Sequence, residues 1–103
     1  MINRLNSLLE LHKKEPMDSF VTYGIALEYI STKDFLKAEE YLSLLLKNDP
    51  NYVPAYMQYA MLNEKTDNIE KAKEIYRKGI LVARELKDLK AANEMEEFLN
   101  DLE

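Results

Sequence analysis

The side chains that most often carry out chemistry are few in this sequence, and they do not cluster. His12 is the single histidine among 103 residues, and cysteine is absent, which excludes thiol nucleophiles, disulfides and cysteine-based zinc sites. A zinc ion at His12 would need carboxylates at most of its other positions, and zinc prefers nitrogen and sulfur ligands. We therefore expect no metal and no cofactor, and interpret His12 as a packing or surface residue.

Serine and acidic residues also lack the neighbours that catalysis requires. The four serines are Ser7, Ser19, Ser31 and Ser43. None has a histidine nearby or a plausible lysine partner, and none lies in a glycine-rich turn of the kind that presents a nucleophile. Adjacent acids such as Glu39 and Glu40 point about 100° apart on a helix, so they do not form a two-carboxylate site. The sequence predicts that the protein is not an enzyme.

Charge argues against nucleic acid and anionic membranes as partners. The formal net charge is −5, which repels phosphate. Residues 65–90 carry eight basic against five acidic side chains, whereas residues 91–103 carry five acids and no base. Within the basic stretch, Glu70 and Glu74 lie among Lys71, Lys73 and Arg77 and weaken the field. We interpret this stretch as a solvated helix face, with a charged docking patch as the alternative.

Composition is that of an ordinary globular chain. Apolar residues make up 47% and charged residues 32%, with two glycines and three prolines, a balance that favours helix. No apolar run approaches the roughly 20 residues that would span a bilayer. Together with the absence of cysteine, this leads us to expect a cytoplasmic protein.

The chain repeats itself with a period of 34 residues. Pairs at this spacing are Pro16 and Pro50, Ala26 and Ala60, and Ala38 and Ala72. Segments 19–52 and 53–86 therefore align without a gap, and each shows apolar side chains at helical spacing on either side of a short polar stretch. With the flanking segments included, we predict six helices at 3–14, 18–31, 34–47, 52–65, 68–86 and 88–101.

Local signals support these helix ends. Pro54 suits a first helical turn, where its missing N–H costs little. Asp67 with Glu70 three residues later predicts a capping box, and Asp88 is expected to cap the last helix. Arg84 stands where the earlier repeat has its closing proline, so the helix before it is expected to run on towards Lys87.

Two helices per 34 residues resembles the tetratricopeptide repeat. The family's packing positions fall on Ile25, Ala26, Tyr29, Ala38, Leu42, Leu45 and Pro50 in the first repeat. In the second repeat they fall on Tyr59, Ala60, Asn63, Ala72, Tyr76 and Gly79. The resemblance departs at Thr22, where a large aromatic is usual, and at Asn63, where tyrosine is common. Small residues at such positions let helices approach closely, and a larger residue one turn away fills the gap.

The resemblance implies an all-α, right-handed α-solenoid of antiparallel helix pairs, about six helices long. It implies a single domain over residues 1–103, made of an N-terminal half repeat at 1–16, repeats at 19–52 and 53–86, and a capping helix at 87–103.

The resemblance also implies a concave surface lined by the first helix of each pair. The expected partner-binding residues are Phe20, Tyr23, Leu27, Met57, Gln58, Met61 and Met95. Gly24 and Glu64 fall at lining positions too. This set is unusually apolar for a surface that meets water, which is typical of interaction sites. We expect an adaptor that binds a protein or peptide partner through an apolar or amphipathic segment.

Two alternatives stay open for these side chains. A terminal helix folded over them would make the row part of the core, and burial against a second copy would make the chain a homodimerisation module. Some family members clamp a C-terminal carboxylate with lysine, asparagine and arginine. The matching positions here are Tyr23, Leu27, Gln58, Asp88 and Ala92. We therefore predict that there is no such clamp.

Overall fold

A computed structural model describes residues 3–103, so residues 1 and 2 of the predicted half repeat lie outside the described part. Six helices follow one another along the chain: α1 (Arg4–Lys14), α2 (Ser19–Ser31), α3 (Phe35–Asn48), α4 (Val53–Lys65), α5 (Ile69–Glu85) and α6 (Leu89–Leu102). Every bound lies within one residue of its prediction. The all-α class and the number of helices are thus confirmed.

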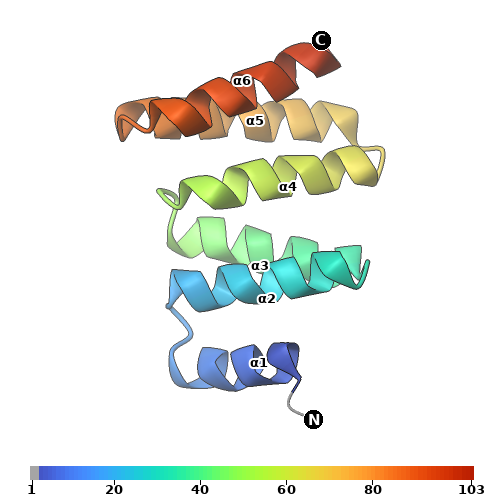
Figure 1. Cartoon of the computed structure of the whole chain (residues 1–103), viewed down its shortest axis with the longest axis vertical. Helices are drawn as coiled ribbons and strands as arrows, with labels where there is room; N and C mark the ends of the chain where they lie inside the picture. Colours follow the sequence, from blue (N-terminus) through green and yellow to red (C-terminus); the bar gives the residue numbers. More distant parts are fainter. Residues whose placement is uncertain (1–2) are drawn as a thin grey trace. The chain divides into compact units, whose positions relative to one another are not determined.

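The helices belong to two compact units that meet in sequence between Asp49 and Pro50. In the first unit α2 packs against both α1 and α3, and in the second α5 packs against both α4 and α6. Figure 1 shows these neighbours side by side within each unit, joined by short turns. The unit boundary falls close to the boundary between the two predicted repeats. The single domain over residues 1–103 stays a prediction.

Aspartates begin three of the six helices in the described part of the chain. Asp18, Asp34 and Asp88 each accept a hydrogen bond from the backbone N–H three residues on, which satisfies a donor that the first turn leaves unpaired. The predicted cap at Asp88 is confirmed, and Pro54 lies in the first turn of α4 as predicted.

The predicted capping box at Asp67 is wrong. Asp67 has φ 62°, in the left-handed region, and the residue before α5 is Asn68. The backbone N–H of Asn68 donates to the carbonyl of Asn63 at 2.7 Å and that of Asp67 to Glu64 at 3.1 Å. This pair of bonds closes the end of α4 as a Schellman motif, so Asp67 ends one helix instead of beginning the next.

Lys33 and Lys87 repeat this geometry after α2 and α5, with φ 62° and 63°. The N–H groups of the following residues, Asp34 and Asp88, donate to Tyr29 and Ala83 at 2.9 and 2.8 Å. Helix α5 therefore ends at Glu85, and the expectation that it continues towards Lys87 is wrong. Each turn reverses the chain in a few residues because a left-handed residue directly precedes a cap.

Small residues mark where helices come closest. Ala26 and Ala38 in the first unit, and Ala60 and Ala72 in the second, are fully buried. The tightest position is Gly79 in α5, where an added Cβ would lie 2.6 Å from Cβ of Tyr56 and 2.8 Å from Sδ of Met95. These neighbours come from α4 and α6, so three helices of the second unit converge on one glycine.

The residues that depart from the family pattern are buried and satisfied locally. Thr22 is 3% exposed and its hydroxyl donates to the carbonyl of Asp18 at 3.1 Å. Asn63 is 1% exposed and its amide donates to the carbonyl of Tyr59 at 2.9 Å. Both bonds run one turn back along the same helix, so neither polar group is left unpaired in the core.

Substituting Gly79→Ala is expected to lower the free energy of unfolding. The new methyl would meet the Cβ of Tyr56, which cannot swing aside, so overpacking of about 1–3 kcal/mol outweighs a helix-propensity gain of about 1 kcal/mol. Urea unfolding followed by circular dichroism measures the difference. Gly24→Ala is the matched control, because its Cβ would lie 3.3 Å from the flexible end of Leu8. A control that is as unstable as Gly79→Ala would contradict this reading.

Substituting Lys87→Gly is expected to raise the free energy of unfolding by about 0.5 kcal/mol. The free energy gained by removing a side chain from the left-handed conformation exceeds the cost of the conformational entropy that glycine adds to the unfolded chain. Lys78→Gly, in the middle of α5, should instead cost about 0.5–1 kcal/mol. Urea midpoints of the two variants give the comparison. Destabilisation by both would show that residue 87 is unstrained.

Candidate protein-binding surface

Helix α2 presents a row of apolar side chains at positions that its packing leaves uncovered. The buried residues of α2 are Val21, Thr22, Gly24, Ile25 and Ala26. Phe20, Tyr23 and Leu27 follow one another at helical spacing beside these. Phe20 is 73% exposed, and Tyr23 and Leu27 are partly exposed. A phenylalanine this exposed is uncommon on a surface that meets only water.

Helix α4 presents a second row of a different kind. Its buried side includes Tyr56, Ala60 and Leu62, whereas Met57, Gln58 and Met61 are partly exposed. The hydroxyl of Tyr56 donates to the carbonyl of Pro50 at 2.6 Å, which ties the start of α4 to the segment before it. Two flexible methionines beside an amide give this row an adaptable, mostly apolar character.

Glu64 lies at the end of the α4 row and is fixed by a tyrosine. The hydroxyl of Tyr76, on α5, donates to Oε2 of Glu64 at 2.5 Å. Burial raises the pKa of Tyr76 well above its usual value, and the bond to the Glu64 carboxylate raises it further. Tyr76 therefore stays a donor at ordinary pH and orients the carboxylate. The sequence pattern placed Glu64 among the lining residues but gave no signal for this anchor.

Two of the residues expected to line an open surface are buried. Met95, on α6, is 0% exposed and packs against Gly79. Gly24 is buried, and a Cβ added there would lie 3.3 Å from the side chain of Leu8 on α1. The expectation that they meet a partner is therefore corrected, because each lies between two helices of its own unit.

Two positions of the family's carboxylate clamp hold residues that cap or pack a helix here, Asp88 and Ala92. The carboxylate of Asp88 accepts a bond from the N–H of Ala91 at 3.2 Å, as the cap of α6. Ala92 is 1% exposed. Neither residue offers the positive charge that a carboxylate ligand needs. The absence of such a clamp stays a prediction.

His12 packs against an aromatic cluster of the first unit. Its ring meets Tyr41 edge-on at 5.7 Å between centroids, and Tyr41 stacks on Tyr29 at 5.7 Å. Burial raises the pKa of Tyr41. The contact of His12 with Tyr41 agrees with its interpretation as a packing or surface residue. Within residues 3–103, no group of three or more histidine or acidic side chains is placed to hold a metal ion.

None of the helices in the described part of the chain has the length and apolar character needed to cross a bilayer.

Tyr76→Phe is expected to lower the free energy of unfolding by about 1–2 kcal/mol, because Glu64 loses its donor while staying partly buried. Folding raises the pKa of Tyr76, so the linked stability is complete below about pH 10 and falls at higher pH. Tyr76→Phe should lack the part of the fall in unfolding free energy at high pH that comes from ionisation of Tyr76. Urea unfolding at pH 7 and pH 11 measures both effects.

Glu64→Gln keeps an oxygen acceptor and serves as the control, with a smaller expected loss at pH 7. Equal stability of Tyr76→Phe and the wild type at pH 7 would mean that the bond contributes nothing.

Comparisons with known proteins bear on this fold directly. The tetratricopeptide repeat family model matches residues 22–52 and 53–86, which lie within the segments 19–52 and 53–86 identified from the 34-residue period. No curated protein sequence matches the chain.

Solved structures give a consistent result. The solution structure of a tetratricopeptide repeat domain protein from Salinibacter ruber is 31% identical, with a TM-score of 0.82 over 85% of this chain and 89% of that one. A crystal structure of a tetratricopeptide repeat domain protein from the same organism is 29% identical, with a TM-score of 0.78 over 82% and 94%. The TPR2B domain of yeast Sti1, in a complex with pHsp70, is 19% identical and shares the fold, with a TM-score of 0.88 over 95% and 78%. The chain belongs to the tetratricopeptide repeat family.

Proposed function

We propose that this chain is a non-catalytic adaptor that binds a partner polypeptide through the first helices of its two repeats, α2 and α4. The observation that carries the proposal is the exposure of large apolar side chains there, above all Phe20 at 73%. Exposed apolar side chains gathered in rows on a well-packed protein are typical of interaction sites. Tetratricopeptide repeat domains generally act as protein-interaction modules, which agrees with this choice.

The two rows favour a partner segment with apolar anchors. On α2, Phe20 and Leu27 offer rigid apolar area, whereas Met57 and Met61 on α4 adapt to the shape of what they meet. Gln58 adds an amide that can bond a backbone group. An apolar or amphipathic segment suits each row, and the complex of the Sti1 TPR2B domain with pHsp70 is an instance of this fold holding a partner.

Charge at the rows disfavours an acidic ligand. Glu64 stands at the end of the α4 row with its carboxylate held by Tyr76. A basic or neutral end to the partner segment would suit this position better than an acidic one. The proposed binding needs no cofactor. We also propose a cytoplasmic location, which the absence of cysteine favours.

Phe20→Ser and Met61→Ser are each expected to weaken partner binding by tenfold or more, because truncation of a buried apolar anchor commonly costs at least about 1–2 kcal/mol. The matched control is Leu36→Ser, a change to an 81% exposed leucine on α3, outside both rows. Polypeptides retained from an extract of the source cells are identified with the wild type, and their affinity for each variant is then measured by calorimetry.

The expected result is one partner that binds the wild type and Leu36→Ser equally and the row variants weakly. Equal binding to all four proteins, with folding intact by circular dichroism, would refute the proposed surface.

A further inference from the structure

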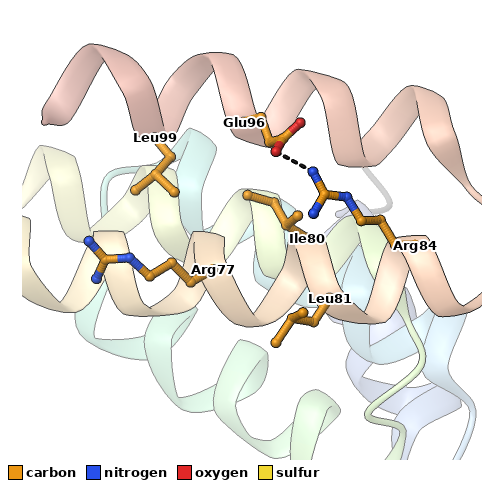
Figure 2. A pocket seen from close by; sticks show the side chains of 6 residues that line it. All are labelled: Arg77, Ile80, Leu81, Arg84, Glu96 and Leu99. Carbon is orange, nitrogen blue, oxygen red and sulfur yellow. Dashed lines mark hydrogen bonds and ion pairs between the residues drawn. The ribbon is translucent and has the colours of Figure 1, made fainter.

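A second surface lies between α5 and α6, wholly within the second unit, and none of its lining residues belongs to the rows of the proposed function. Its lining residues are Arg77, Ile80, Leu81, Arg84, Glu96 and Leu99, around a depression of about 280 Å³. We call it the arginine groove. Figure 2 shows Ile80 and Leu99 between the two helices, with Leu81 on the side of α5 that faces away from α6.

The α5 residues of the arginine groove form one stripe. Arg77, Leu81 and Arg84 follow at i, i+4 and i+7, so they share a helix face, and the arginines stand about 10.5 Å apart along the axis. Ile80 is 5% exposed, whereas Leu81 is 63% exposed. The stripe therefore offers an exposed apolar side chain flanked by two guanidinium groups.

Helix α6 shows which chemistry this stripe accepts. Arg77 pairs with Glu103 at 3.1 Å and Arg84 pairs with Glu96. Glu96 and Glu103 are seven residues apart, as the arginines are, and Leu99 lies between them and faces the groove. An acid, an apolar residue three positions later and a second acid seven positions later, the last directly after the end of α6, thus already lie along one side of the stripe.

The side of the stripe that faces away from α6 presents the same two arginines with an exposed leucine, Leu81. Both arginine side chains are 51% exposed despite their ion pairs. A guanidinium has five N–H donors, more than one carboxylate uses, so each can bridge a carboxylate on either side. Leu81 supplies the apolar contact on the outer side, as Ile80 does towards α6.

The local charge selects the same kind of partner. Helix α5 carries five basic and three acidic side chains, in a chain of net charge −5. Nucleic acid is a poorer fit, because Glu96 lines the groove and its centre is apolar. We propose that the arginine groove docks an acidic amphipathic helix of a partner protein, with two carboxylates seven residues apart flanking an apolar side chain.

The probe for this proposal is an alanine-based helical peptide with glutamate, leucine three residues later and glutamate seven residues after the first. Binding to the isotope-labelled full chain is followed by amide chemical shifts. We expect saturable shifts that centre on residues 77–85, and at least a fivefold loss of affinity with Arg84→Gln. The control Lys47→Gln, an exposed change on α3 of the first unit, should alter affinity less than twofold.

Leu81→Gln separates docking from any effect on α6, because Leu81 makes no part of the two ion pairs; it should also weaken binding at least fivefold. A peptide with glutamines in place of both glutamates should not bind. The proposal is overturned if the acidic peptide causes no saturable shifts at millimolar concentration or if the glutamine peptide binds equally. It is also overturned if Leu81→Gln binds as the wild type does, or if a single-stranded oligonucleotide shifts these resonances and the peptide does not.

Discussion

The distance at which neighbouring helices can pack is the constraint on which this structure depends. Helices approach most closely at Gly79, because an added Cβ there would overlap side chains from both α4 and α6. Buried alanines also allow close packing of helices, with Ala26 and Ala38 in the first unit and Ala60 and Ala72 in the second. Where backbones come this close, larger residues one turn away, such as Leu42 and Tyr76, fill the remaining space and are fully buried.

The same constraint determines what remains outside. Each first helix uses its small residues and one side of its surface for packing, so Phe20 on α2 and Met57 and Met61 on α4 are left with exposed area. The buried amide of Asn63 is satisfied one turn back along its own helix, and the partly buried carboxylate of Glu64 is satisfied by a tyrosine. The well-packed interior and the apolar rows are thus two results of one arrangement, and the rows carry the proposed function.

The fold could be predicted from the sequence because its signals are periodic and local. The 34-residue spacing of alanines and prolines, with helical apolar spacing within each repeat, predicted four helices, and apolar spacing in the flanking segments predicted the other two. Contacts between distant side chains could not be read in this way. Burial of Met95 depends on its fit against Gly79, the anchoring of Glu64 depends on Tyr76, and the pairing of Arg77 and Arg84 with α6 depends on the register of two helices. The prediction of Asp67 as an N-cap is wrong because aspartate is common both at N-caps and in the left-handed conformation that it adopts here.

The central claim is that the apolar rows of α2 and α4 are kept for a different polypeptide. Light scattering behind a sizing column, over a wide range of protein concentrations, tests it most directly. We expect a mass near that of one 12.1 kDa chain throughout. A mass near twice this value that persists on dilution, and that returns to one chain when Phe20 and Met61 are both replaced by serine, would contradict it. The rows would then be covered by a second copy.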